Sequence, residues 1–339
     1  MAAPEFYRNS VEEVERVLER LKKAEVKQVA RSPGGRPVYA VAYGEKEPVE
    51  RTANLSSALA GRKPEAFYGS GRTRQVMMIV SAMHGAEMES IAGVLNLFSV
   101  LETGSDRKGK PWEALAEAAE QMRLVVVPCL NPDGRARIAC DDPLTWSHDQ
   151  LEKYRHGLWK DGSHITWPAC KNWHPMPPEK VVFMGGYFND AGANPAHGVF
   201  LPREVAVETH AVLDLVLEET PDLYLDLHSC GSGPFFIPGQ PMLPELFRLR
   251  SYYVEGHCVR LLRERGLRPK ARSRPSAAQV IDLYTAAYHV AGSMCMLFEG
   301  PHGAQKGNEY THEEIVDIYL TTFEGLLAIG AEEGFKPNG

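Results

Sequence analysis

The stretch VMMIVSAMHGAE, residues 76–87, decides how the rest of the sequence is interpreted. Its first part, residues 76–82, is a nearly continuous apolar run, which is typical of a central strand that is buried on both faces. His84 and Glu87 follow, three residues apart, where the chain leaves this strand. The stretch therefore predicts a buried strand that delivers two potential metal ligands at its carboxyl end.

Other polar side chains follow predicted strands in the same way. Strands are predicted at 124–127, 223–227 and 294–298, and they are followed by Asn131, His228 and Glu299. Helices are predicted over 91–101, 112–119, 204–217 and 243–265. This alternation predicts an α/β fold with a mixed, mostly parallel sheet flanked by helices. Sites in such sheets lie beyond the carboxyl ends of the strands, so we expect His84, Asn131, His228 and Glu299 to converge.

The flanking segments complete the outline. Capping boxes at Ser10/Glu13 and Thr311/Glu314 predict an N-terminal helix and a C-terminal helix that ends near residue 329. Strands are expected at 26–30 and 38–43 across the turn 33–35, followed by a long connection over 44–75. We predict one catalytic domain over residues 1–339, with a long Trp/His-rich insertion at about 141–200.

Composition narrows the classes of protein. The chain has 339 residues, and its net charge of -7 gives no basic footprint for nucleic acid. It contains no apolar run of about 18 residues, which a transmembrane helix needs, and its first residues do not resemble a signal peptide. The six cysteines are scattered without a CxxC pair, which predicts reduced thiols and a cytoplasmic location. The sequence gives no indication of the oligomeric state.

The residues at the strand ends match the needs of zinc catalysis. A catalytic zinc takes three protein ligands from histidine and carboxylate and keeps one position open for water; the His₂Glu set of carboxypeptidase A is a known example. His84, Glu87 and His228 supply such a set. The ion lowers the pKa of its water to about 7. A carboxylate must then accept the water proton and pass it to the leaving amine, and Glu299 is placed for that role.

Each of these residues has an ordinary structural interpretation when it is taken alone. An HxxE spacing occurs often by chance, a histidine at a strand end usually makes a hydrogen bond, and Glu299 before Gly300-Pro301 could be a surface carboxylate. The ordered set of four, all after strands, favours the metal site. The histidines of the insertion lack a tight ligand spacing, so a second metal is not expected.

Four motifs together resemble the zinc metallocarboxypeptidases of the carboxypeptidase A type. They are His84-Gly85-Ala86-Glu87, Asn131-Pro132-Asp133-Gly134, Asp226-Leu227-His228-Ser229 and Phe298-Glu299. The segment 31–39 is similar to the first hairpin of that family, and the resemblance covers about residues 10–330. It implies a sheet of about eight strands between helices, one Zn²⁺ and hydrolysis of C-terminal peptide bonds.

The resemblance also implies how substrate is bound. In the family an arginine shortly after the NPDG turn polarises the scissile carbonyl, and Arg135 and Arg137 are the candidates. An Asn-Arg pair normally binds the terminal carboxylate, but here Asn189 is followed by Asp190. A carboxylate at that place repels an acidic terminus and attracts an amine. Tyr284 and Tyr288 are the candidates for the tyrosine that precedes the base, although their spacing differs from that of the family.

Three functions follow from these observations. The first is a zinc peptidase that resembles the carboxypeptidases but recognises the C-terminus differently. The second is a zinc amidase or deacylase that acts on a small N-acyl substrate, so that in both cases the partner is a peptide or an amide-containing small molecule. The third is a catalytically silent binding protein on the same scaffold. Retention of Glu299 beside a full ligand set speaks against the third, because a silent protein needs no base.

Overall fold

The computed structural model contains a seven-stranded mixed sheet. It describes residues 3–69, 71–140, 142–237, 242–270, 280–303 and 309–336. The strand order is β1-β2-β4-β3-β7-β9-β8. The bounds are β1 Glu25–Arg31, β2 Pro37–Tyr43, β3 Val76–Val80, β4 Arg123–Val127, β7 Leu223–Cys230, β8 Phe235–Ile237 and β9 Met294–Pro301. The predicted fold class, an α/β sheet flanked by helices, is confirmed.

The four central strands, β4, β3, β7 and β9, are parallel, and antiparallel strands flank them. β3 and β4 are completely buried, as their apolar sequences predict for strands that are covered on both faces. Because parallel strands run in one direction, the carboxyl ends of β3, β7 and β9 meet at one edge of the sheet. The residues that follow these strands therefore share one location.

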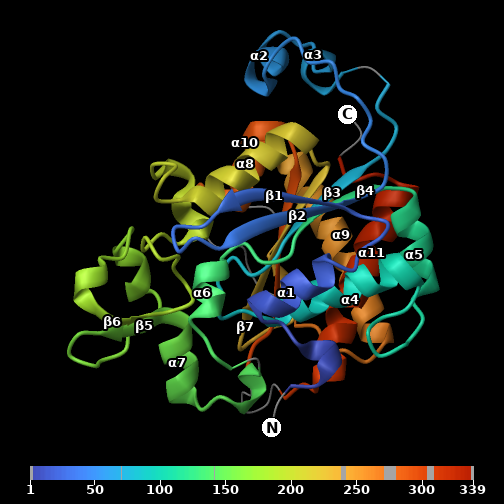
Figure 1. Cartoon of the computed structure of the whole chain (residues 1–339). Coiled ribbons are helices and arrows are strands. Elements are labelled where there is room, and N and C mark those ends of the chain that lie inside the picture. Colours follow the sequence, from blue (N-terminus) through green and yellow to red (C-terminus); the bar gives the residue numbers. More distant parts are fainter. Residues whose placement is uncertain are drawn as a thin grey trace.

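Helices cover both faces of the sheet (Figure 1). One core cluster joins the sheet to α1 Val11–Leu18, α4 Glu89–Thr103, α5 Glu113–Glu120, α9 Glu245–Glu264 and α11 His312–Glu332. The other joins it to α8 Val207–Glu219 and α10 Leu283–Ala291. The Thr311/Glu314 capping box opens α11, and Ser10 caps α1 through the backbone N–H of Glu13. The two apolar clusters explain why the sheet is an interior layer.

The predicted insertion contains structure that its sequence did not reveal. It folds into η2 Pro143–Thr145, α7 His148–His156, β5 Gly157–Trp159, η3 Ala169–Asn172, η4 Pro178–Lys180, β6 Val181–Met184 and η5 Pro195–Phe200. β5 and β6 pair as a separate two-stranded sheet, which Figure 1 shows with α7 at one side of the main sheet. A capping box of Ser147 and Gln150 starts α7 and was not recognised in the sequence.

Other segments also differ from the expectation. The long connection 44–75 contains α2 Leu55–Ala60 and α3 Glu65–Tyr68, and the chain begins with η1 Glu5–Tyr7. The Asn131–Gly134 turn opens a short helix, α6 Pro132–Ala136, because the Asn131 side chain accepts the backbone N–H of Gly134. β8 and α10 were not predicted. Within the described residues, no helix combines the length and apolar character that a membrane span requires.

Candidate metal centre and active site

The turn after β3 is built around close backbone contacts. The N–H of Gly85 donates to the carbonyl of Gly186 over 2.7 Å. A Cβ on Gly85 would collide with the backbone of Gly134 and Arg135. Only glycine allows this approach, so the turn between His84 and Glu87 is packed against α6. This packing fixes the direction in which both side chains leave β3.

His84, Glu87 and His228 come together as a buried cluster. One potential ligand atom from each side chain lies within 4.8 Å of the other two. Nδ1 of His84 lies 2.8 Å from Oε1 of Glu87, and Nδ1 of His228 lies 3.0 Å from Oε2 of the same carboxylate. The three side chains therefore share one small volume, and His228 reaches it from within β7, two residues before the strand ends.

An oxygen orients the second ring nitrogen of each histidine. Nε2 of His84 lies 3.2 Å from Oδ1 of Asn194, and Nε2 of His228 lies 3.5 Å from a carboxylate oxygen of Asp226. Tyr187 also stacks on the His84 ring, with 3.8 Å between centroids. An acceptor at Nε2 holds the tautomer in which Nδ1 is a lone-pair donor. Both histidines thus present Nδ1 to the same point.

The ionisation of the cluster follows from its burial and its charges. Burial alone raises the pKa of Glu87, but His84 and His228 outweigh it and hold that pKa well below its usual range. Burial lowers the pKa of His84 to about 4. Burial also opposes the charge on His228, yet Glu87 and Asp226 raise its pKa well above the usual value. The carboxylate is ionised, and the cluster favours a positive charge between its members.

These residues fit a zinc ion. The donor set is two imidazoles and a carboxylate, which zinc prefers, and each imidazole has the outer oxygen partner that is typical of metal-binding histidines. Among the described side chains, the buried carboxylate of Glu87 has hydrogen-bond contacts with the rings of His84 and His228. A cation bound between the three groups would satisfy that charge in the same way as a protonated histidine.

Glu299 lies beside the cluster. It pairs in register with His228 across β7 and β9, and on its other side it pairs with Phe235 of β8. Its side chain is half-buried. Its charge, together with that of Glu87, contributes to the raised pKa of Tyr187, whose main cause is burial. Because the ring of Tyr187 stacks on His84, the charge of Glu299 is felt close to the metal-ligand cluster.

A cavity of about 170 Å³ adjoins the cluster. It is lined by Cys170, Lys171, Trp173, His174, Phe188, Asn194 and His197. Asn194 is the residue that orients His84. Nζ of Lys171 donates to Nε2 of His197 over 3.1 Å, and no ion pair joins Lys171 to a carboxylate of the described residues. Burial and then Lys171 lower the pKa of His197 to about 3, so this imidazole is a neutral acceptor. The cavity therefore offers a cation beside the cluster.

The two predicted carbonyl-polarising arginines have other roles. Arg135 has 1% of its surface exposed and donates to the backbone and side chain of Asn9 and to the carbonyl of Ile138. Arg137 donates to the carbonyls of Met184, Gly185 and Phe188 and to Asp190. Both guanidinium groups hold the backbone around the site, which argues against the predicted role at the scissile carbonyl.

Asn189 and Asp190, which were predicted to contact substrate in place of the family's Asn-Arg pair, hold the fold together. Asn189 is completely buried, donates to Val205 and Glu208, and accepts backbone N–H groups. One oxygen of Asp190 pairs with Arg137 at 3.0 Å and the other with Arg36 at 3.3 Å. With two arginines against it, Asp190 does not present a free negative charge to a substrate. The physical basis for expecting an amine-bearing substrate is therefore removed.

The two tyrosine predictions fall on α10. Tyr284 has 1% of its surface exposed and packs in the core cluster beneath that helix. Tyr288 packs against Phe247, with 5.2 Å between ring centroids. A residue as buried as Tyr284 has no surface for a substrate, which argues against that prediction. α10 was not predicted, so the direction of its side chains could not be judged.

Sequence reasoning missed Asn194, Tyr187 and Lys171. Asn194 precedes Pro195 and caps η5, which gave a local signal for a turn but none for a contact 110 residues away. Arg155 was missed too. It lies in the last turn of α7, and its charge, like that of Lys171, acts on the thiol of Cys170, whose pKa burial raises to about 11.

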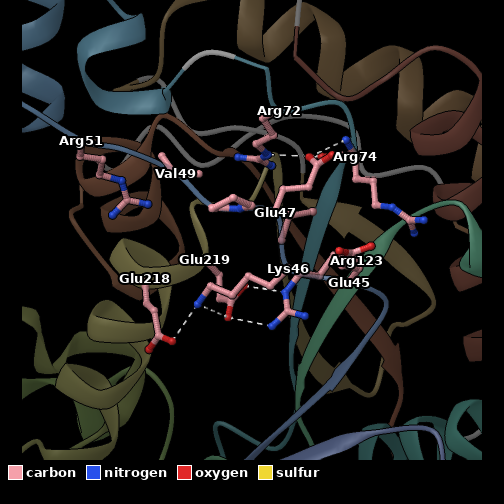
Figure 2. Close-up of a pocket in the computed structure, with 12 residues that line it drawn as sticks. Glu45, Lys46, Glu47, Val49, Arg51, Arg72, Arg74, Arg123, Glu218 and Glu219 are labelled. Carbon is pink, nitrogen blue, oxygen red and sulfur yellow. Dashed lines mark hydrogen bonds and ion pairs between the residues drawn. The ribbon is translucent and has the colours of Figure 1, made fainter.

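A separate cavity of about 360 Å³ lies at the opposite end of the sheet, where β3 and β4 begin (Figure 2). Its charged side chains largely neutralise one another. Lys46 pairs with Glu218 and Glu219, and Arg123 forms a bidentate pair with Glu219. It contains none of the residues at the carboxyl edge. This cavity is therefore separate from the candidate metal site.

The fold and the buried His-Glu-His cluster define a metallopeptidase. The family model described as zinc carboxypeptidase matches residues 14–295, so the chain belongs to the zinc carboxypeptidase family. Three of the four residues of the proposed site lie inside the matched range, and Glu299 follows it by four residues. A search of curated proteins finds no match.

Solved structures share the fold at low sequence identity. A metallo-carboxypeptidase from Burkholderia cenocepacia is 16% identical, with a TM-score of 0.59 over 95% of this chain and 70% of that chain. One from Pseudomonas aeruginosa, in complex with (2-guanidinoethylmercapto)succinic acid, is 14% identical, with a TM-score of 0.58 over 95% of this chain and 70% of the other. A putative carboxypeptidase from Burkholderia mallei is 15% identical, with a TM-score of 0.60 over 95% of this chain and 68% of that chain. These likenesses support the fold.

Proposed function

We propose that the protein is a zinc-dependent hydrolase of a peptide or amide bond, with Zn²⁺ held by His84, Glu87 and His228. The observation that carries this proposal is the convergence of the three side chains within 4.8 Å, with an oxygen behind each imidazole. When bound, the ion would act as a Lewis acid and lower the pKa of a water molecule. Because the ligands and the base span residues 84–299, we take the chain as one catalytic domain.

Glu299 is proposed as the general base. Its carboxylate accepts a proton from the attacking water and later passes that proton to the nitrogen of the leaving amine. The pairing of Glu299 with strands on both sides fixes its backbone beside His228. A half-buried carboxylate at this place keeps enough contact with solvent to exchange protons between turnovers.

Arg155 is proposed to replace Arg135 and Arg137 as the cation that stabilises charge on the scissile carbonyl oxygen. It comes after the Asn131–Gly134 turn, and its ion pair with Glu152 is 4.0 Å long. Its charge reaches Cys170, which lines the cavity beside the cluster. A fixed cation where negative charge develops contributes up to about 3–4 kcal/mol to the transition state.

Lys171 is proposed as the group that recognises the C-terminus. Its ammonium lies in the cavity beside His84 and donates to a neutral imidazole, so its charge is available to a substrate carboxylate. A single ammonium binds such an anion as a point charge, without the bidentate geometry of arginine. Recognition is therefore altered from that of the family, but it still favours a peptide with a free acid end.

The alternative is a zinc amidase or deacylase that acts on a small N-acyl substrate. The cavity of about 170 Å³ favours it, because so small a space suits one residue or a small acyl group. The silent binding protein is the third possibility. It is disfavoured by the position of Glu299 in register with His228, for which binding alone gives no reason.

A substrate panel on the zinc-loaded protein tests these functions. Matched peptides with a free acid end and an amide end are compared with N-acyl amino acids, with and without a chelator. Preference for the free acid, lost in Lys171→Met, supports the peptidase. Preference for N-acyl amino acids supports the deacylase, and zinc content without turnover on any amide supports the binding protein.

We also propose that the protein works in a reducing, cytoplasmic setting, with the substrate as its partner. All six cysteines are free thiols, and four of them are buried. The net charge of -7 gives no reason to expect nucleic acid as a partner. Mass spectrometry of thiols alkylated in cell extracts tests the setting, and oxidised cysteines in the native protein would argue against it.

A further inference from the structure

A buried histidine–carboxylate pair lies just beyond the strand that carries the proposed base. Nδ1 of His302 is 2.8 Å from Oε1 of Glu89, and both side chains have 0% of their surface exposed. The backbone N–H of Gly303 donates to the same oxygen over 3.3 Å. The rings of Trp146 and His302 are nearly perpendicular, with 6.1 Å between their centroids. Neither side chain reaches solvent, so neither can touch a substrate.

The pair joins the two turns that carry the proposed chemistry. His302 is the first residue beyond β9, three residues after Glu299. Glu89 is the first residue of α4, two residues after Glu87. The end of the base-bearing strand is therefore tied to the turn that bears a metal ligand. Beside this link, the Tyr319 hydroxyl contacts the Ser229 hydroxyl, and a Cβ on Gly300 would collide with it, so the strand end is also held by close packing.

Stability alone is a poor reason for such a pair. Burying polar atoms costs free energy unless each is hydrogen-bonded, and Oε2 of Glu89 and Nε2 of His302 have no partner among the described residues. Replacing such a buried pair by apolar side chains is often neutral or stabilising. The surrounding cluster of apolar residues could accept such side chains. What an apolar replacement would lose is a directional link of 2.8 Å between two specific turns.

We infer that Glu89 and His302 are positioning residues, which hold the carboxylate of Glu299 at its working distance from the metal ligands. This inference rests on the proposed function. The ligands themselves are fixed by Asn194, Asp226 and each other. Loosening the pair therefore moves the base and leaves the metal in place.

The test compares His302→Leu with His302→Asn, in which the side-chain amide can donate to Glu89 from nearly the same place as Nδ1. His302→Leu lowers kcat by about 10- to 100-fold, because displacing reacting groups by about 1 Å costs up to about 10²-fold. It leaves KM, zinc content and the absorption spectrum of the cobalt-substituted protein unchanged. His302→Asn recovers most of the loss, whereas His302→Gln, which cannot donate from that place, does not.

The double variant Glu89→Leu/His302→Leu separates positioning from stability. It is expected to unfold at or above the wild-type temperature and still show the reduced kcat. The matched control is His312→Leu, which breaks a histidine–carboxylate pair with Asp142 at 3.0 Å that lies outside the proposed machinery, and its kcat stays at the wild-type level. A double variant with wild-type kcat, or loss of zinc from His302→Leu, overturns the inference.

Hydrogen exchange gives a readout that does not need activity. Amides of residues 299–303 exchange roughly tenfold faster in metal-free His302→Leu than in the metal-free wild type, and they are unchanged in His312→Leu, because local opening sets the exchange rate. Equal exchange rates in His302→Leu and wild type would refute the inferred role of the Glu89–His302 pair. If wild-type protein hydrolyses no amide while this difference is present, the proposed function fails and the link between the two turns stands.

Discussion

Asp226→Asn is the most informative perturbation of the metal site, because it changes one charge and almost no volume. Asp226 has 1% of its surface exposed, and its carboxylate lies 3.5 Å from Nε2 of His228. We predict weaker zinc binding with the fold retained. Outer carboxylates of this kind contribute about 10- to 100-fold to metal affinity.

The structure places the expected loss at the lower end of that range. A separation of 3.5 Å is longer than a good charge-assisted hydrogen bond, which measures about 2.7–2.9 Å. Asp226 also helps Glu87 to raise the pKa of His228, so its removal reduces competition from protons and offsets part of the loss. We therefore expect about a tenfold weaker affinity, which is about 1.4 kcal/mol.

The assay is a competition titration of zinc against a chromophoric chelator at constant pH. Asp106→Asn is the matched control, because Asp106 has 3% of its surface exposed and binds Trp112 and its own loop, away from the ligands. Wild-type affinity in Asp226→Asn would refute the assigned orientation of His228. An equal loss in Asp106→Asn would show that the effect is general destabilisation.

Three further predictions follow from the site and its surroundings. Glu299→Gln keeps its zinc but loses about 10²- to 10⁴-fold in kcat, as measured in steady state on the best substrate, and a normal rate would exclude Glu299 as the base. Lys171→Met raises KM for free-acid peptides by roughly 10-fold and leaves amide-ended peptides unchanged, since one charge contact is lost; equal effects on both would remove Lys171 from recognition. Burial raises the pKa of Glu208 from 4.5 to about 7, so the folded chain keeps a proton that the unfolded chain releases, and stability falls as pH rises from about 4.5 to 7. Glu208→Gln should therefore gain of order 1–3 kcal/mol over wild type at pH 8 in denaturant unfolding, and little at pH 5, whereas an equal difference at both pH values would contradict that pKa.

The sequence was sufficient to predict the parts of the candidate site in which a potential ligand or base directly follows a buried strand. The apolar run before His84 and the strands before His228 and Glu299 were visible because buried parallel strands have a composition of their own. Their parallel direction then brings three sequence-distant residues to one edge. The candidate metal ligands could therefore be proposed from their residue types and from their position at the carboxyl edge of the sheet.

The substrate side could not be predicted in the same way. Arg135, Arg137 and Asp190 were chosen by their distance along the chain from motifs, but contacts across the fold decide their roles. Arg137 pairs with Asp190 over 53 residues, and Arg135 reaches Asn9 over 126. The insertion also has mixed periodicity, because its short elements pack on one another and bury few residues each. Lys171 could therefore be found only after that segment was folded.

Metal content tests the central claim most directly. Purified wild type and His228→Ala are loaded with zinc, freed of excess by gel filtration and measured by elemental analysis, while circular dichroism confirms that both are folded. We expect one zinc per chain in the wild type and strong loss in His228→Ala, because the variant keeps only two of three ligands. Equal zinc in the two proteins would contradict the assignment of this site.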